Sequence, residues 1–565
     1  MPKHPAAAAR AAQADRPIPP RRAALAYLAC LAHGSPRAGL GLAGLLGALG
    51  ALGGCGGGQD GASPADTAAD TETAQQLAAG AAAFNGGPRA HVEGAFGPVF
   101  TWPVMPIHMA LLPDARVLAY GTDRLGRQGA GLLYTVWDPA LGLGPEAFTT
   151  LPNQTGTDVF CAAQALLPGG QVMLVGGDLD RGGTTNEGNP DVNLFDPATN
   201  RLARAGALAY PRWYPTLVLT PAGERVVLGG RMRVLRSGGV VVGREVASTP
   251  EAFTPGQGWR RLAGAASDEA YGETADSFYY PRAWVAPRGD VFILGHDGQL
   301  FSLDVRGAGS LSRWSAWVPP ANMRLPSAMF APGRILSLRG SRRAVVLDLN
   351  GAAPRVQATA AVPTNRQWGG ATVLADGQVW VNGGSVTPNR LADAHYAGEL
   401  WNPATGLWTR TARAAQARLY HSAALLLADG SVLTGGGGAP GPLTQLNGEI
   451  YYPPYLFMAD GSGRLAPRPA VAAPAQARLG SELALTLAAG TTARRVTLLR
   501  AGSATHALNV EQRFTSLAFT QDGTRLRAAL PASPNLLPPG HYLLFVFDAQ
   551  GVPSPASILH LSTLA

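Results

Sequence analysis

The sequence predicts an all-β protein, a seven-bladed β-propeller followed by an immunoglobulin-like β-sandwich. The first observation is compositional: of 565 residues, 72 are Gly and 46 are Pro, while 46% are apolar and 15% are charged. Abundant Gly and Pro without a collagen-like period are typical of many short strands joined by tight turns. The apolar content excludes a chain that is disordered throughout. The other two observations are an internal repeat and a C-terminal region that lacks it.

The repeat consists of an apolar strand, a turn containing Pro, Asp or Gly, a second apolar strand and often a Gly-Gly pair. Each turn is expected to join its two strands as a tight hairpin. Between corresponding turn positions the steps are 55, 53, 66, 45, 43 and 53 residues. This spacing matches kelch-type propeller blades, so seven copies fill one ring over residues 97–460, whereas an array of β-sandwiches would not share this signature. The seven copies are 112–121, 167–177, 220–230, 286–295, 331–340, 374–384 and 427–438.

Residues 465–565 lack the repeat and are expected to form a separate C-terminal domain. Short apolar segments alternate there with Gly and Pro turns, at Glu482–Leu487, Arg495–Arg500, Leu526–Leu530 and Tyr542–Phe547. About 100 residues of this kind predict an immunoglobulin-like sandwich.

Residues 1–54 have the character of an export signal. Basic residues precede Gly39–Gly54, a stretch of 16 Gly, Leu and Ala residues that is short for a membrane span. The stretch runs into Cys55 as Leu-Gly-Gly-Cys, which resembles the lipobox of bacterial lipoproteins. We therefore expect lipidation of Cys55 and an exported protein, either lipid-anchored at a bacterial cell envelope or extracellular; a marginal membrane helix is the alternative.

Residues 55–96, rich in Ala, Gly, Thr and Asp, are expected to be a flexible linker.

The net charge of +8 does not indicate nucleic-acid binding. The segment 1–54 carries +5 of it, which leaves +3 on the other 511 residues, without a basic stripe. We expect a monomer whose membrane contact is limited to the N-terminal lipid anchor.

Five repeats carry a chemically distinctive side chain seven residues before the turn. Equal register from the same turn places side chains at the same height in successive blades, and alternation along a strand lets them face one way. One rim of the propeller should therefore carry a thiol, phenols, an imidazole and an indole. The set is Cys161, Tyr214, Tyr280, Trp368 and His421, with Tyr420 beside the last.

Imidazole and phenolate oxygen together suit Cu(II) among the common metals. A copper site of this kind would want a second imidazole, and His506, between strands of the C-terminal domain, could be delivered by a loop that reaches into the propeller channel. Taken singly, each residue has an ordinary explanation: a lone Cys such as Cys161 is usually an apolar core residue, and a Tyr-His pair a packed aromatic beside a hydrogen-bonded imidazole. The shared register favours a site.

At these residues the chain resembles the copper radical oxidases, the family of galactose oxidase and glyoxal oxidase. The resemblance covers roughly residues 100–565 and implies an early-set type for the C-terminal domain. The matching segments are 158–161, 212–215, 418–422, 435–438, 453–456 and 505–509.

The resemblance implies one copper ion with a radical cofactor. Tyr214 would be an equatorial ligand, joined through its ring to the sulfur of Cys161 by a thioether bond, and would hold a tyrosyl radical. Tyr420 would be the axial ligand and the base that takes the substrate proton, and His421 and His506 would complete the ligand set. The implied reaction is oxidation of an aldehyde or primary alcohol by O₂ with release of H₂O₂.

Departures from galactose oxidase favour small aldehydes or α-hydroxycarbonyl compounds over galactose. Where galactose oxidase has the aromatic residue that stacks over its thioether, this chain has Met232, whereas Trp213 immediately before the implied radical tyrosine is more like glyoxal oxidases. The chain also leaves no room before residue 97 for a separate carbohydrate-binding domain. Residues expected to line the substrate pocket are Trp213, Tyr280, Arg282 and Trp368, although Arg282 could equally make a blade-to-blade hydrogen bond.

Two other functions stay open. A non-catalytic propeller on the cell envelope could bind glycan or protein, since fold does not fix function. An ordinary copper protein would keep the Tyr and His ligands without a crosslink. A binding module has no need of Cys161 in register with Tyr214.

Overall fold

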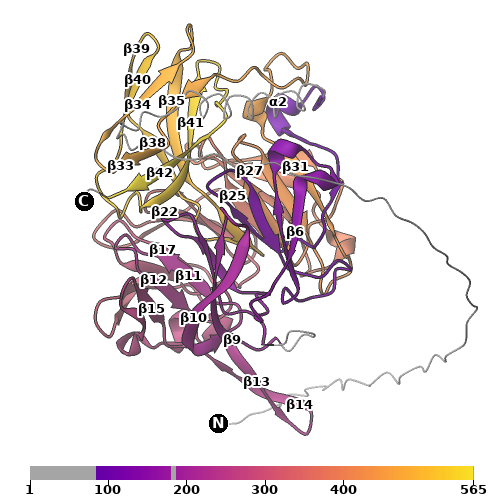
Figure 1. Ribbon diagram of the computed structural model, residues 1–565, viewed down its shortest axis with the longest axis vertical. Coiled ribbons are helices and arrows are strands. Elements are labelled where there is room, and N and C mark those ends of the chain that lie inside the picture. Colours follow the sequence, from indigo (N-terminus) through magenta and orange to yellow (C-terminus); the bar gives the residue numbers. More distant parts are fainter. Residues whose placement is uncertain (1–83, 180–185, 564–565) are drawn as a thin grey trace, which may run out of the picture. The chain divides into compact units, whose positions relative to one another are not determined.

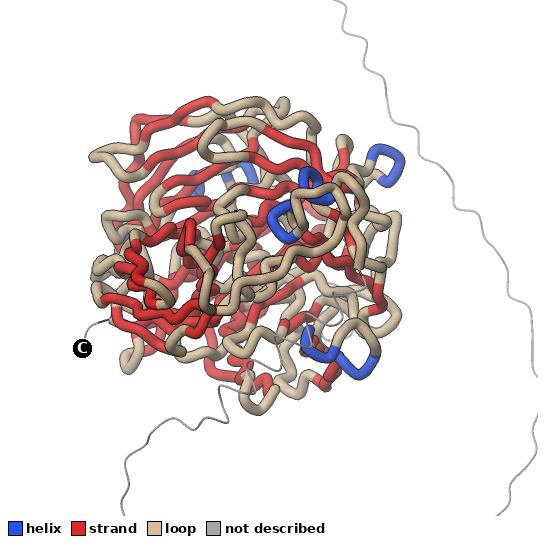
Figure 2. The backbone as a smooth tube through the Cα atoms, turned by 90° about the horizontal axis from the view of Figure 1, so that it is seen from above, coloured by secondary structure: helices blue, strands red, loops and turns tan. Residues whose placement is uncertain are grey.

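The computed structural model describes residues 84–179 and 186–563. The predicted signal segment 1–54, the lipidation site Cys55 and the first part of the predicted linker lie outside the described residues. Strands make up most of the regular secondary structure of the described chain (Figures 1 and 2). Its α-helices are the short α2 (Ala90–Glu93) and α3 (Asp268–Tyr271), and none of its helices has the length and hydropathy needed to span a membrane.

Seven antiparallel sheets follow one another along the chain and form the blades of a propeller, which confirms the predicted fold class. In every blade the first two strands are the hairpin that the turn pattern predicted. The first blade contains β3 (His108–Leu111), β4 (Val117–Tyr120), β5 (Leu133–Trp137) and β6 (Phe148–Pro152), and the second contains β7 (Ala163–Leu166), β8 (Val172–Val175), β9 (Asn189–Asp196) and β10 (Arg201–Arg212). The third contains β11 (Thr216–Leu219), β12 (Arg225–Leu228), β15 (Glu251–Thr254) and β16 (Gly258–Arg261), and the fourth contains β17 (Arg282–Val285), β18 (Val291–Leu294), β19 (Gln299–Asp304) and β20 (Ser310–Trp317).

The burial pattern of the strands explains their apolar composition. The two inner strands of a blade are covered on both faces by neighbouring blades, so they are continuous apolar runs, as in the fully buried β4. Outer strands alternate between covered and exposed residues, as β20 does. The remaining blades contain β21 (Ser327–Ala331), β22 (Arg334–Leu338), β23 (Ala344–Asp348), β24 (Arg355–Ala358); β25 (Gln367–Val373), β26 (Val379–Ser385), β27 (Ala397–Trp401), β28 (Trp408–Arg413); and β29 (Ser422–Leu426), β30 (Val432–Gly436), β31 (Asn447–Tyr452).

The outer edge of the seventh blade is supplied from the N-terminal side of the chain. The strands β1 (Ala95–Phe96) and β2 (Phe100–Thr101) both pair with β31, which closes the ring. The prediction that residues 55–96 are a flexible linker is therefore wrong for the described residues 84–96, which include α2 and β1. Their order comes from an apolar contact with Leu456 and Phe457, a tertiary contact that local composition does not reveal.

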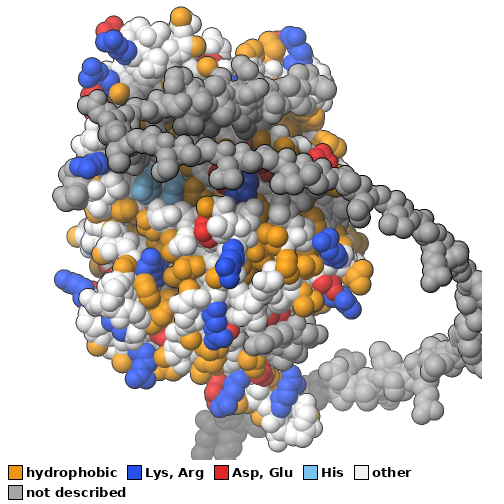
Figure 3. Space-filling view, in the orientation of Figure 1, with side chains coloured by type: hydrophobic (Ala, Val, Ile, Leu, Met, Phe, Trp, Pro, Cys, Tyr) orange, Lys and Arg blue, Asp and Glu red, His pale blue; other side chains and the backbone are white. Residues whose placement is uncertain are grey.

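A two-stranded hairpin extends from the third blade (Figure 1). It consists of β13 (Arg231–Ser237) and β14 (Val240–Val246). The face in Figure 3 shows basic and acidic side chains interspersed, without one continuous basic patch. This agrees with the small net charge outside residues 1–54.

The C-terminal region is a sandwich of two sheets with its own apolar core, which confirms the second part of the predicted fold. One sheet contains β32 (Val471–Ala472), β34 (Glu482–Leu487), β40 (Arg525–Ala529) and β39 (Phe519–Asp522), and the other β33 (Gln476–Arg478), β42 (Ser557–Ser562), β41 (Gly540–Asp548), β35 (Ala493–Arg500) and β38 (Phe514–Leu517).

One hairpin of the C-terminal region joins the propeller instead of the sandwich. The strand β36 (Ser503–Thr505) pairs with β3, and β37 (Leu508–Asn509) pairs with β36, so both extend the sheet of the first blade inward. The hairpin also lies against the inner strands β7, β21, β25 and β29 of four other blades. It therefore occupies the axis of the propeller.

Buried Arg–Glu pairs stabilise three blades at the point where the chain enters the inner strand. Each guanidinium also donates to backbone carbonyls, and the paired side chains are at most 4% exposed. Each Arg lies two residues before an aromatic residue of the predicted rim, so the pair fixes the segment that leads into the rim. The pairs are Arg212–Glu251 (3.0 Å), Arg366–Glu399 (2.7 Å) and Arg418–Glu449 (3.1 Å).

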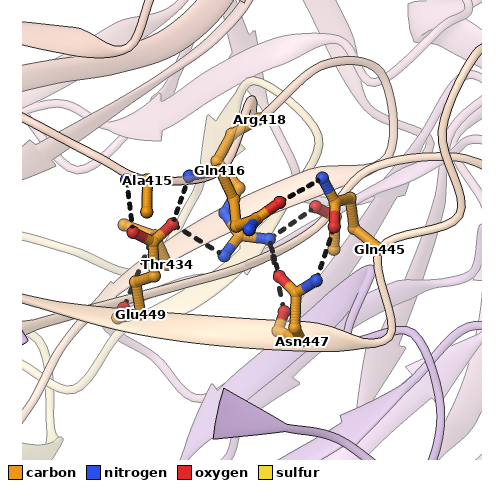
Figure 4. Close-up of polar contacts among 8 residues, drawn as sticks. Ala415, Gln416, Arg418, Thr434, Gln445, Asn447 and Glu449 are labelled. Atoms are coloured by element: carbon orange, nitrogen blue, oxygen red, sulfur yellow. Dashed lines mark hydrogen bonds and ion pairs between the residues drawn. The ribbon is translucent and has the colours of Figure 1, made fainter. Parts of the chain in front are cut away.

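The pair in the seventh blade belongs to a wider hydrogen-bond network. Figure 4 shows the Arg418 guanidinium between Glu449 and Asn447, whose Oδ1 accepts a hydrogen bond at 2.8 Å. Glu449 also accepts hydrogen bonds from the backbone N–H groups of Ala415 (2.7 Å) and Gln416 (3.1 Å). The carboxylate therefore fixes the segment that ends at Tyr420.

We predict that Glu449→Ala lowers the free energy of unfolding by about 3–5 kcal/mol, because it leaves a buried guanidinium without its counter-charge. The matched control is Glu482→Ala, which breaks the exposed pair with Arg527 (2.8 Å) and should cost below about 1 kcal/mol. Urea denaturation of the two variants and the parent measures both values. Equal losses in the two variants would contradict the structural role of the buried pair.

Candidate metal centre

The rim residues share an unusual backbone conformation. A positive φ is uncommon for residues other than Gly and is strained for bulky side chains, and such residues cluster at functional sites. Here the left-handed residue comes at the start of the inner strand, at the offset that the sequence singled out. The residues are Cys161 (φ 59°), Tyr214 (66°), Tyr280 (43°), Trp368 (66°) and His421 (65°), and His506 on the axial hairpin has φ 54°.

The structure brings five of the predicted residues into one cluster on the propeller axis. The Tyr214 hydroxyl lies 2.7 Å from His506 Nε2 and 3.2 Å from His421 Nε2, and it hydrogen-bonds the hydroxyl of Tyr420. The Cys161 sulfur and the ring nitrogens of the two histidines lie within 4.8 Å of one another. Residues from the second, third and seventh blades and from the axial hairpin therefore converge on one point.

Hydrogen bonds at Nδ1 orient both imidazoles. His421 Nδ1–H donates to the Gly438 carbonyl at 2.7 Å. The Thr505 hydroxyl donates to the Ile107 carbonyl (3.1 Å), so its oxygen accepts the Nδ1–H of His506 at 2.7 Å. Both rings therefore direct an Nε2 lone pair at the Tyr214 oxygen, as metal-ligating histidines do.

The donor set fits a copper ion. Two imidazole nitrogens and two phenolic oxygens meet at one buried point, and this combination suits Cu(II). The residues that would hold the ion are Tyr214, Tyr420, His421 and His506, the four that the motifs implied.

Burial keeps the metal-free cluster uncharged. It lowers the pKa of His421 to about 3 and holds the pKa of His506 well below its usual value. Burial likewise raises the pKa of Cys161, Tyr214 and Tyr420. A bound cation would reverse this preference for the phenols, because it stabilises phenolate ligands. Metal binding should therefore release protons from tyrosine.

Aromatic rings surround the cluster. The Trp213 ring centroid lies 4.0 Å from that of Tyr214, and the Tyr280 ring lies 4.6 Å from it. Trp368 lies 4.4 Å from the half-buried Tyr420. Trp213, Tyr280 and Trp368 thus lie beside the tyrosines.

Arg282 has a different environment. It is 3% exposed, and its guanidinium donates to the carbonyls of Met323 (2.8 Å) and Leu325 (3.3 Å) in the approach to the fifth blade. It makes the blade-to-blade contact that was the alternative to substrate binding.

Sequence reasoning missed Arg231 and Tyr279. The Arg231 guanidinium lies 4.2 Å above the Trp213 ring and donates to the Tyr279 hydroxyl at 3.2 Å, and the Tyr279 ring is 5.4 Å from that of Tyr214. Arg231 directly follows a Gly-Gly pair of the repeat, which was a usable signal. Tyr279 is adjacent to a rim residue but one position away from the shared offset.

The propeller carries this cluster on its axis, and a hairpin of the C-terminal region supplies one of its histidines. Together they offer the donor set of a copper protein. Residues 468–561 match the family described as galactose oxidase-like, early set domain. Galactose oxidase of Gibberella zeae is 26% identical over 503 residues, which cover 83% of this chain and 71% of that protein. An aldehyde oxidase of Arabidopsis thaliana is 24% identical over 461 residues, 71% of each chain.

Among solved structures, a fungal alcohol oxidase in complex with copper is similar, with 25% identity and a TM-score of 0.72 over 83% of this chain and 100% of that one. The matched family model, these relatives and this solved structure support the resemblance of the chain to the copper radical oxidases. The resemblance seen in the motifs is thereby confirmed.

We predict that the copper-free protein loses stability as the pH falls from about 6.5 toward 3. Burial and the charges of Arg282 and Arg339 lower the pKa of His296 to about 3, and burial does the same for His421. In the unfolded chain both titrate near 6.5, so in this window the unfolded state binds more protons and is favoured. Urea denaturation at pH 7, 5 and 4 measures how steeply the free energy of unfolding changes with pH. His296→Gln should give a shallower slope, whereas an unchanged slope would contradict the assignment.

Proposed function

We propose that the protein is a copper radical oxidase that oxidises small aldehydes or primary alcohols with O₂ and releases H₂O₂, with small aldehydes preferred. The observation that carries the proposal is the Tyr214 hydroxyl, which contacts both histidine Nε2 atoms and the Tyr420 hydroxyl while the Cys161 thiol lies in the same cluster. A glycan- or protein-binding propeller has no use for this arrangement.

Each residue has a distinct task in this proposal. His421, His506, Tyr214 and Tyr420 would hold one copper ion, which would supply one oxidising equivalent and lower the pKa of the substrate oxygen. Tyr420 would accept the substrate hydroxyl proton; among these four residues it is the one that is not fully buried, which supports this role. Tyr214, once crosslinked to Cys161, would hold the second oxidising equivalent and would take a hydrogen atom from the substrate carbon.

The electrons and protons balance. A primary alcohol that becomes an aldehyde, or a hydrated aldehyde that becomes a carboxylic acid, loses two electrons and two protons. One O₂ accepts them and leaves as H₂O₂. The protein therefore needs no cofactor besides the copper ion and its own tyrosine.

The aromatic surroundings support both the radical and the substrate class. Trp213 covers the Tyr214 ring, which shields a radical from water, and Arg231 covers Trp213 in turn. Trp368 lies beside Tyr420 and Tyr280 lies beside Tyr214, and bulky rings next to both tyrosines favour small carbonyl compounds over a sugar ring.

The proposal extends to the location of the protein. From the sequence alone we infer export through residues 1–54 and a lipid anchor at Cys55, at a bacterial cell envelope or outside the cell. The enzyme would act there as a monomer on diffusible substrates.

The central test is the crosslink. After copper loading in air, a peptide map should contain the Cys161 and Tyr214 peptides joined, lighter than their sum by about two hydrogens and resistant to reduction. Cys161→Ser should abolish the link and lower kcat for peroxide release at least about tenfold, equivalent to about 1.4 kcal/mol. Tyr280→Phe is the matched control and should crosslink normally. If Cys161 stays free and alkylatable with copper bound, the radical mechanism is contradicted. The alternative of a copper protein without a crosslink would then hold.

Substrate preference is tested with the crosslinked enzyme. Peroxide release should give a kcat/KM at least about tenfold higher for small aldehydes such as glyoxal than for galactose, because bulky aromatic rings lie beside both tyrosines. A coupled peroxidase assay measures both. Faster turnover of galactose would contradict the aldehyde preference without touching the radical mechanism.

A further inference from the structure

His108 contacts the metal centre although no motif includes it. It lies on β3, is 0% exposed, and its Nε2 accepts a hydrogen bond from the Cys161 backbone N–H at 3.2 Å. An imidazole nitrogen that accepts a hydrogen bond carries no proton, so the neutral ring is protonated on Nδ1.

The hydrogen bond to His108 is the first of a series around the rim. In the next blade the Tyr214 N–H donates to the Cys161 carbonyl at 3.1 Å, and in the blade after that the Tyr280 N–H donates to the Tyr214 carbonyl at 2.8 Å. Tyr214 and Tyr280 are thus each tied to the left-handed residue of the preceding blade. At Cys161 the acceptor is a side chain instead, so His108 takes the place that a backbone carbonyl has in the next two blades.

The His108 ring is held rigidly. It stacks on the Tyr120 ring with centroids 4.5 Å apart and an interplanar angle of 6°. The Tyr120 hydroxyl donates to Gln164 Oε1 (3.0 Å), and the Gln164 amide donates to the Met109 carbonyl on β3. The acceptor that His108 offers to Cys161 therefore has a fixed position.

On the opposite side, β3 is tied to the hairpin that carries the second histidine ligand. Its residue His108 pairs in register with Thr505, and the His108 and His506 rings are 5.9 Å apart. His108 therefore couples the position of the thiol to that of the axial hairpin.

We propose that His108 is a positioning residue for formation of the thioether cofactor. Its Nε2 holds the Cys161 backbone in the left-handed conformation that directs the sulfur toward the Tyr214 ring. This inference rests on the proposed function. In the crosslinking step a C–S bond forms between the sulfur and a ring carbon, the S–H and ring C–H bonds break, and the two electrons and two protons released pass to O₂, giving H₂O₂.

The test compares acceptor-retaining and acceptor-free variants. His108→Gln keeps an oxygen that can accept the Cys161 N–H, whereas His108→Leu has a similar volume and no acceptor. Purified copper-free proteins are mixed with Cu(II) in air, and the linked peptide is quantified over time by mass spectrometry. We expect the Leu variant to crosslink at least about tenfold more slowly than the parent and the Gln variant within about threefold of it. Copper stoichiometry should stay at the parent value, because His108 is outside the proposed ligand set.

The outcomes separate this inference from the proposed function. If the parent crosslinks and His108→Leu does so at the same rate, the positioning role is overturned and the oxidase proposal stands. If the parent itself never crosslinks, both are overturned. Should His108→Leu fail to fold, His108→Asn decides, since its amide is too short to reach Cys161. Equal rates for the Asn and Gln variants then overturn the role, and a slow Asn variant supports it.

Discussion

The pairing of β36 with β3 is the contact on which the metal centre depends. A propeller alone supplies Cys161, Tyr214, Tyr420 and His421 from its inner strands, but it leaves the axis open. The hairpin closes the axis and places His506 opposite the others. The site therefore exists only when both parts of the chain are folded and joined.

The sandwich is attached to the propeller at the turn end of the blades. The Arg513 guanidinium donates to the Val285 carbonyl (2.8 Å), and the Thr497 hydroxyl donates to the Ala375 carbonyl (3.0 Å). Gln512 exchanges two hydrogen bonds with the backbone of Val373, both at 2.8 Å. These contacts fix the base of the axial hairpin, so its tip reaches the rim with little freedom, and a histidine held this way is preorganised for binding.

Much of the fold could be predicted because the informative signals are local. A Pro, Asp or Gly turn between two apolar strands specifies a hairpin wherever it occurs, and seven copies specify the ring. The rim could be predicted for the same reason, since a fixed distance from the turn places Cys161, Tyr214 and His421 at one height. The left-handed backbone at those positions was not visible in sequence.

Long-range contacts made by ordinary residues could not be predicted. The pairing of β1 and β2 with β31 joins segments about 350 residues apart, and the Ala- and Gly-rich composition around β1 resembles a linker. His108 touches Cys161 through a side-chain-to-backbone bond that leaves no spacing pattern. For Arg282 the sequence left substrate binding and a blade-to-blade hydrogen bond open, and the structure shows carbonyl partners in the approach to the next blade.

The environment of Cys161 narrows the chemistry that the thiol can perform. Burial raises its pKa, so at neutral pH it is a protonated thiol, and it has no second cysteine among the described residues with which to form a disulfide. While no cation is bound, a buried neutral thiol is a poor nucleophile. In the proposed function the thiol couples oxidatively to the adjacent tyrosine, a step that needs an oxidant at the site. The imidazoles and phenols that surround Tyr214 are the donors that would hold such an oxidant, a copper ion with access to O₂. The proposed crosslink thus gives a reason for both the cysteine and the ligand set. A binding propeller or a copper protein without a crosslink would not require the two together.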